Sequence, residues 1–439
     1  MLKKKFTKLI GLKYDDFLAY EESGQIITQN ARLIPTLKTG DEGALASIFL
    51  TTLKLVKEYR DTLFKELKLS RGSNIFYFTE VAFPEVDKNS RCDGLIIIVS
   101  KGVIKEAIVF EMKNKNNSVD RVQVEKYINL CKKIGVNKLA TISNEFVADS
   151  TQSPVNVKSP KNFSLYHFSW TYLITKGRLL LFKNENIIKD EDQIEIMREV
   201  LYYFESPVSG INGYTIMKPG WKELVEKIKN RVPLKVSDPF IEEAIFSWHE
   251  EEKDMALHLS QKLGVLVKSS SKGKDKVKED IRKIVNDQHL NGNLSIKNSV
   301  SDIKILVDFE IKSVSMAVKV IPPLDKGTVA RITWIGRQLE ACKKKNEEVF
   351  SCIEKDILVE ADVKYAKEHL RVKLSELDQL NEESKGKEIT SFNIVLMSNF
   401  GAGFGSTKKF IVLIEKMLFD YYAGIVQYLT NWNRPAPRL

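Results

Sequence analysis

The chain has 439 residues, of which 43% are hydrophobic and 29% are charged, and its formal net charge at pH 7 is +10. This length exceeds what one hydrophobic core usually accommodates, so we expect two or three domains. The composition is typical of a soluble globular protein, no apolar run reaches the ~20 residues of a membrane span, and the basic charge permits contact with a polyanion without identifying it.

The cysteines and the N-terminus favour a cytoplasmic protein. The four cysteines lack the spacing of a zinc or iron–sulfur site, so we expect reduced thiols at Cys92, Cys131, Cys342 and Cys352. The segment Met1–Lys5 is basic, but no apolar stretch with a cleavage site follows it, and we expect no secretory signal and no membrane partner. The five histidines show no metal-ligand spacing and are expected to have surface or packing roles.

The first third of the chain predicts an α/β layer. Residues 41–68 carry apolar side chains at helical spacing and predict a long amphipathic helix with Glu42 in its first turn. Three strands, a helix that ends at Gly135 and a fourth strand follow, over residues 74–83, 93–99, 107–113, 119–134 and 138–146. This order is typical of a mixed sheet flanked by helices.

The remaining residues predict two further parts. A strand and a helix are expected over 163–182, a mostly helical stretch over 186–265, and a linker at Ser269–Lys274. Beyond the linker we expect helices and strands that include residues 276–285, 303–309, 317–321, 330–345, 392–397 and 408–428. We therefore predict an N-terminal α/β domain (1–185), a helical connecting region (186–268) and a C-terminal α+β recognition or regulatory domain (269–439).

Two acids and a lysine stand at the ends of neighbouring predicted strands. Strand alternation puts Glu111 and Lys113 on one face, and Asp93 opens the strand before them. If the hairpin loop has three residues, Lys101–Val103, Asp93 lies opposite Glu111 on that face. A two-residue loop would pair Asp93 with Phe110 and put the two acids on opposite faces. A shared site therefore requires the odd loop length.

These residue types suit a divalent metal ion. Asp93 and Glu111 would supply carboxylate oxygens and Met112 a backbone carbonyl, which are ligands that Mg²⁺ or Mn²⁺ accepts. Lys113 could lower the pKa of an attacking water or stabilise charge on a phosphorane. Without a metal ion, such a group at the end of apolar strands would be costly.

Gln123 and Tyr127 share one face of the next predicted helix and could orient the lysine or contact a phosphate. With them, Asp93 and the Glu111-x-Lys113 pair resemble the PD-(D/E)xK, or restriction-endonuclease-like, phosphodiesterase superfamily over roughly residues 40–150. The Gln-x-x-x-Tyr element is similar to that of its RecB-type branch. The resemblance implies metal binding by the two acids, catalysis by the lysine, assistance from Gln123 and Tyr127, and a restriction-endonuclease-like sheet.

Two other positions bear on this resemblance. Arg91-Cys92 stand where the family name has its proline, and the upstream histidine of RecB-type nucleases has no counterpart. Glu42 or Glu80 would serve as an additional metal-binding acid. The basic residues Lys115, Arg121 and Lys126 near the site would contact nucleic acid or form a solvated helix face.

The expected function is that of a Mg²⁺- or Mn²⁺-dependent nuclease. We expect an endonuclease that cleaves DNA, although RNA remains open as a substrate. The expected biological role is restriction or anti-phage defence. The alternatives are a non-catalytic nucleic-acid-binding or regulatory protein on a nuclease fold, and strand-end charges that form an exposed ion pair. A homo-oligomer and an unidentified protein activator both remain open. The loop Asn399–Lys408 follows a strand and precedes a helix, but it matches no nucleotide-binding motif, so a flexible glycine loop is favoured.

Overall fold

A computed structural model gives the fold of most of the chain. The residues that it describes are 5–31, 33, 40–72, 74–115, 117–147, 150–182, 188–270, 273–366 and 369–433. The chain divides into two compact units, Met1–Tyr214 with Ser260–Gly264, and Thr215–Leu259 with Val265–Leu439. The predicted connecting region 186–268 is divided between these units and forms no third one. The predicted boundary at residue 185 and linker residues 271–272 lie outside the described residues.

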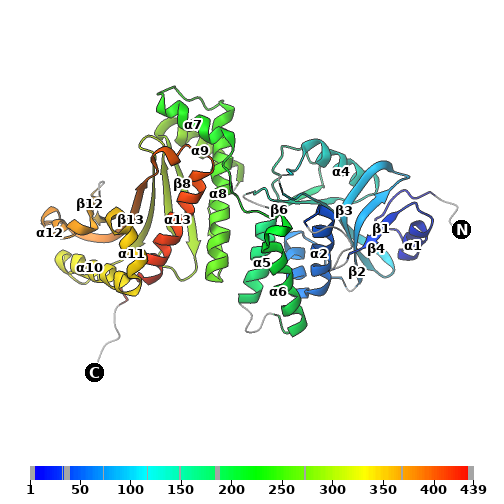
Figure 1. Ribbon diagram of the computed structural model, residues 1–439, viewed down its shortest axis with the longest axis horizontal. Coiled ribbons are helices and arrows are strands. Elements are labelled where there is room, and N and C mark those ends of the chain that lie inside the picture. Colours follow the sequence, from blue (N-terminus) through cyan, green and yellow to red (C-terminus); the bar gives the residue numbers. More distant parts are fainter. Residues whose placement is uncertain are drawn as a thin grey trace. The chain divides into compact units, whose positions relative to one another are not determined.

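The first unit is built on a six-stranded sheet (Figure 1). Its elements are α1 (Tyr14–Glu22), β1 (Ile27–Asn30), α2 (Glu42–Leu55), α3 (Lys57–Glu66), β2 (Asn74–Phe83), β3 (Asp87–Ser100), β4 (Val103–Met112), α4 (Arg121–Lys133), β5 (Lys138–Ser143), β6 (Ser164–Ser169), α5 (Trp170–Phe182) and α6 (Glu191–Glu205). The strands lie in sequence order, antiparallel from β1 to β4 and parallel from β4 to β6. The predicted α/β class and mixed sheet are confirmed.

Helices cover both faces of this sheet. In β3, Ile96 and Ile98 pack with the apolar residues of α2, α3, α5 and α6, whereas Leu95 and Ile97 pack with those of α1 and α4. The alternation follows from the pleat of the strand, which points successive side chains to opposite faces. Because both faces are buried, the strand interior is apolar throughout. Charged residues at its end therefore lie at the margin of a dry core.

The predicted helix 41–68 is two helices. Val56 lies between α2 and α3 with an extended backbone, φ −102° and ψ 96°. The side-chain oxygen of Gln193 accepts a hydrogen bond from the amide of Lys57 (2.8 Å), which is the first residue of α3. A side chain from α6 thus satisfies an amide that the interrupted helix leaves open. Sequence periodicity alone could not reveal this break, because its partner is 136 residues away.

The β3–β4 hairpin reaches the required register by an unexpected route. Its loop has two residues, Lys101 and Gly102, both with positive φ (53° and 72°), and Ser100 pairs with Val103, so the predicted three-residue loop is wrong. Such a turn suits the twist of antiparallel strands. A β-bulge then shifts the register by one residue between Ile98 and Val99, which pair with Glu106 and Ile104, and leaves Lys105 as the extra residue.

The bulge brings Asp93 and Glu111 to the same face of the sheet. Gly94 pairs with Phe110, so the next pair along the ladder is Asp93 and Glu111. The N-terminal segment supports the bulge, because Gly11 donates to the carbonyl of Ile104 (2.8 Å) and the amide of Ile104 donates to Leu12 (2.9 Å). These bonds between residues distant in sequence stabilise the bulge, and the bulge sets Asp93 opposite Glu111.

Acid is expected to destabilise the first unit through His167 on β6. This side chain is fully buried, and burial lowers its pKa from 6.5 to about 4. Since the unfolded chain binds the proton more readily, the stabilisation is present above pH 6.5 and is lost as pH falls toward 4. The loss amounts to roughly 3 kcal/mol, at about 1.4 kcal/mol per pH unit.

Chemical denaturation of the wild type and of His167→Gln across this pH range measures the effect. The variant is expected to be less stable at neutral pH, because His167 hydrogen-bonds Thr141 (2.8 Å) and the carbonyl of Glu145 (2.9 Å), but to lose less stability on acidification. Equal pH dependence in the two proteins would contradict the assignment.

The second unit is an α+β structure around a seven-stranded antiparallel sheet, as predicted for the C-terminal domain. The strand order is β12-β11-β13-β10-β9-β8-β7. Its elements are α7 (Pro219–Lys229), α8 (Pro239–Leu263), β7 (Val267–Ser269), α9 (Gly273–Asp287), β8 (His289–Ile296), β9 (Ile303–Asp308), β10 (Ser313–Val320), α10 (Thr328–Lys345), α11 (Glu347–Ile353), β11 (Ile357–Val363), β12 (Leu370–Lys373), α12 (Gln379–Glu383), β13 (Ile389–Asn399) and α13 (Lys409–Gly424).

Helices α8 and α13 run side by side in this unit (Figure 1). Trp248 of α8 is fully buried and donates its indole N–H to the carbonyl of Asn291 in β8 (3.1 Å), which fixes the helix against the sheet. His258 of α8 contacts Glu415 of α13. Within the described part of the chain, no helix combines the length and apolar character needed to cross a bilayer.

Candidate active site

The two acids predicted at the strand ends share one poorly solvated place. Asp93 Oδ2 accepts a hydrogen bond from the amide of Met112 (2.6 Å), which holds the side chain against the end of β4. Burial and the charge of Glu111 raise the pKa of Asp93 well above its ordinary value, against the opposing effects of Met112 and Lys113. Burial also raises the pKa of Glu111, although its bond with Lys113 acts in the other direction. An added positive charge would be favourable here.

Glu111 has one oxygen in use and one without a partner. Its side chain is 3% exposed, and Oε1 accepts hydrogen bonds from Lys113 Nζ (2.8 Å) and from the amide group of Gln123. Oε2 is buried and has no hydrogen-bond partner among the described residues. A buried carboxylate oxygen left in this state is energetically costly. It offers a lone pair to a ligand.

Lys113 is held in place by its backbone as well as by its side chain. Its amide donates to the carbonyl of Ile142 (2.7 Å), and the indole of Trp170 donates to its carbonyl (2.9 Å). Burial alone would lower the pKa of Lys113, but Glu111, Glu42 and the charge of Asp93 together raise it. The ammonium therefore remains charged at neutral pH, which suits electrostatic stabilisation and not proton abstraction.

The structure brings Glu42 to this site and directs Glu80 elsewhere. Glu42 Oε2 lies 3.4 Å from Lys113 Nζ, and its Oε1 accepts bonds from the amide of Asn114 (3.2 Å) and the side chain of Asn117 (2.8 Å). Glu80 instead pairs with Arg91 (Nε–Oε2 2.8 Å). Of the two acids that the sequence offered, Glu42 is the one beside the lysine.

Gln123 and Tyr127 lie on the face of α4 that covers the strand ends, as the sequence predicts. The backbone amide of Gln123 donates a hydrogen bond to the side chain of Asp120 (2.9 Å), which caps α4. The side-chain amide of Gln123 donates to Glu111. The hydroxyl of Tyr127 donates to the carbonyl of Arg91 (2.8 Å), next to the start of the apolar part of β3. Burial and the charge of Glu111 raise the pKa of Tyr127, so it stays protonated and remains a donor.

Two supporting residues were missed by sequence reasoning. Trp170 is fully buried, and its indole N–H holds the carbonyl of Lys113. Asn114 is 1% exposed and donates to the carbonyl oxygens of Gly40 (2.9 Å) and Ser209 (2.5 Å), which joins two loops to the end of β4. A polar residue directly after the Glu-x-Lys pair was the only available signal for Asn114.

The basic residues predicted to contact nucleic acid lie at the surface. Lys115, Arg121 and Lys126 are exposed. Arg121 forms an i,i+4 ion pair with Glu125 (2.9 Å), which favours a solvated helix face for this residue. A contact of the three with nucleic acid stays a prediction.

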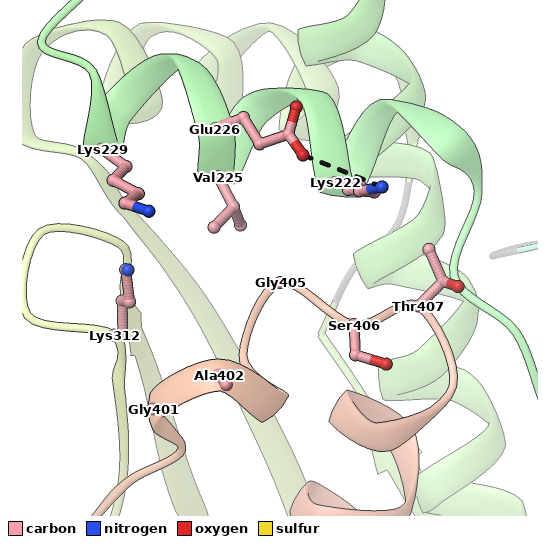
Figure 2. Close-up of a pocket in the computed structure, with 10 residues that line it drawn as sticks. All are labelled: Lys222, Val225, Glu226, Lys229, Lys312, Gly401, Ala402, Gly405, Ser406 and Thr407. Carbon is pink, nitrogen blue, oxygen red and sulfur yellow. Dashed lines mark ion pairs between the residues drawn. The ribbon is translucent and has the colours of Figure 1, made fainter.

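The glycine-rich loop 399–408 belongs to the second unit, far in sequence from the strand-end acids. It lines a hollow of about 490 Å³ together with Lys222, Glu226 and Lys229 of α7 (Figure 2). Lys222 and Glu226 form an ion pair (3.8 Å). Ser406 Oγ accepts a hydrogen bond from the amide of Lys409 (3.2 Å), the first residue of α13. This hydroxyl therefore satisfies a backbone amide at the N-terminus of the helix.

Comparison of the chain with protein-family models, with curated proteins and with solved structures gives no match. The function therefore rests on the chemistry of the strand-end site itself.

Proposed function

We propose that the first unit is a metal-dependent nuclease of the restriction-endonuclease-like type, which hydrolyses phosphodiesters, with DNA as the first substrate to test. The observation that supports this proposal best is the meeting of Asp93 and Glu111 beside the ammonium of Lys113. One buried oxygen of Glu111 there has no hydrogen-bond partner in the part of the chain that the structure describes. Exposed ion pairs at strand ends would not require such burial.

The donor atoms fit a hard divalent ion. Asp93 and Glu111 would hold Mg²⁺ or Mn²⁺ through carboxylate oxygens, together with the carbonyl of Met112 expected from the sequence. Mg²⁺ commonly takes one or two carboxylates and keeps several waters, which matches a site with two close acids. When bound, the ion supplies an activated water and neutralises charge on the phosphate.

The protein side chains would divide the remaining work. The charged Lys113 would stabilise the negative charge that develops on the phosphate oxygens. Glu42 and Glu111 hold its ammonium from two sides, and Gln123 orients Glu111. Tyr127 fixes the backbone at Arg91, two residues before Asp93. Each bond restricts a side chain that would otherwise have to be ordered during the reaction.

Cleavage of supercoiled and linear DNA by the full chain tests the proposal. We expect nicking with Mg²⁺ or Mn²⁺ and none with a chelator, and a parallel arm with RNA of the same sequence decides the sugar preference. DNA binding without cleavage by folded protein under all metal conditions would support the alternative, a non-catalytic nucleic-acid-binding protein on this fold.

A further inference from the structure

A second group of ligating side chains lies between two helices of the second unit. Asp254 and His258 are one turn apart on α8, and Glu415 faces them from α13. His258 Nδ1 is 2.7 Å from Glu415 Oε1, and His258 Nε2 is 3.8 Å from Asp254 Oδ1. One ligand atom from each residue lies within 4.8 Å of the other two, and no other trio of histidine, cysteine or acid in the described chain meets this condition.

A third acid, Glu251, lies near this group. Glu251 precedes Asp254 by one helical turn and is 0% exposed, and neither of its oxygens has a hydrogen-bond partner among the described residues. Burial and the charges of Asp254 and Glu415 raise the pKa of Glu251, so its carboxyl is near enough to interact electrostatically with both.

Neighbouring buried acids on α8 are satisfied by protein groups. Glu252 accepts bonds from the amides of Ser270 (3.1 Å) and Asn293 (2.9 Å), and Glu250 pairs with Lys218 (2.6 Å). Glu251 differs from these two neighbours, because neither of its oxygens has such a partner among the described residues. Two carboxyl groups beside one imidazole, with the buried carboxyl of Glu251 near them, form an electron-rich cluster that a divalent cation would stabilise.

We propose that Asp254, His258 and Glu415, with Glu251 behind them, form a transition-metal site that joins α8 to α13. The mixed donor set indicates the kind of ion: imidazole suits Zn²⁺, whereas sites for Mg²⁺ and Ca²⁺ are built from oxygen donors alone. Spacing of i and i+4 on one helix with a third ligand from another is compatible with a tetrahedral ion that keeps one water. The side chains of His258 and Glu415 are 30% and 22% exposed, which gives the ion a way in. This site does not depend on the nuclease proposal.

Metal titration of the full chain tests the site, with Zn²⁺ and Co²⁺ as probes. The protein is first stripped with a chelator, and excess Mg²⁺ is kept present to occupy the strand-end acids. Calorimetry is expected to give one Zn²⁺ per chain, and Co²⁺ is expected to give visible absorption bands from nitrogen and oxygen coordination. In His258→Ala and in Glu415→Gln, Zn²⁺ affinity should fall at least tenfold and the Co²⁺ bands should disappear.

The chain offers a matched control. His289 also pairs with a carboxylate, Asp308 (3.0 Å), but belongs to no such trio. His289→Ala is expected to bind Zn²⁺ as the wild type does. Zn²⁺ binding of equal strength in the wild type, His258→Ala and Glu415→Gln, or no binding by the folded wild type, would overturn the proposal. Glu415→Gln, which keeps the shape of the side chain, keeps the test decisive should His258→Ala fold poorly.

Discussion

Asp93→Asn is expected to slow metal-dependent cleavage strongly and to leave the metal-free protein at least as stable as the wild type. The amide oxygen of an asparagine can still accept the bond from Met112 that Asp93 accepts (2.6 Å), so the strand end keeps its geometry. The substitution removes a carboxylate whose charged form is opposed by burial and by the charge of Glu111. It also removes a proposed metal ligand, and we expect the rate to fall by a factor on the order of 10³.

Two measurements separate these effects. Thermal unfolding in a chelator should show a midpoint equal to or above that of the wild type, and the increase that Mg²⁺ gives the wild type should be reduced, because the ion binds the native state less well. Glu80→Gln is the matched control, since Glu80 lies on the neighbouring strand and pairs with Arg91 (2.8 Å). Cleavage that survives Asp93→Asn but is lost in Glu80→Gln would show that the ion is held on the other side of β3.

Lys113→Met is expected to lower the rate of cleavage by a factor on the order of 10² to 10³ without weakening metal binding. Methionine keeps much of the length of the side chain and loses its charge, while the bonds of the Lys113 backbone to Ile142 and Trp170 do not involve the side chain. The ammonium lies 2.8 Å from Glu111 Oε1 and competes there with any bound cation. Mg²⁺ should therefore bind the variant at least as tightly.

Single-turnover cleavage at saturating DNA, together with the shift in unfolding temperature on adding Mg²⁺, reports the two quantities separately. Lys133→Met removes the same charge from an exposed position in the last turn of α4 and should leave both unchanged. Loss of Mg²⁺ binding in Lys113→Met would mean that the lysine holds the acids in place and does not act on the substrate.

Much of the first unit could be predicted because its signals are local. The predicted strand 74–83 coincides with β2, and the helix with Gln123 and Tyr127 begins within two residues of its predicted start. The pairing of Asp93 with Glu111 was also foreseen, but through a wrong loop length. The bulge that corrects it depends on backbone bonds from Gly11 and Leu12, and no pattern within the hairpin encodes a partner so far away.

The other surprises also come from residues distant in sequence. The break at Val56 involves Gln193, which accepts a hydrogen bond from the first residue of α3. Glu42, and not Glu80, lies beside Lys113 because α2 begins next to the end of β4. The cluster in the second unit joins His258 to a glutamate 157 residues later. Ligand spacing along the chain reveals sites built within one element, so such a cluster appears only after folding.

The bulge has a consequence for how the protein folds. A two-residue turn closes early and locally, and the regular ladder that it favours would set Asp93 opposite Phe110. The arrangement that unites the acids needs Gly11 and Leu12 to dock on Ile104, a contact across more than ninety residues of chain, and contacts of this separation form slowly. A nascent hairpin would therefore pass first through a mispaired form, in which the acids lie apart. Gly11 and Leu12 would therefore complete the pairing of the two acids only after β4 has been synthesised.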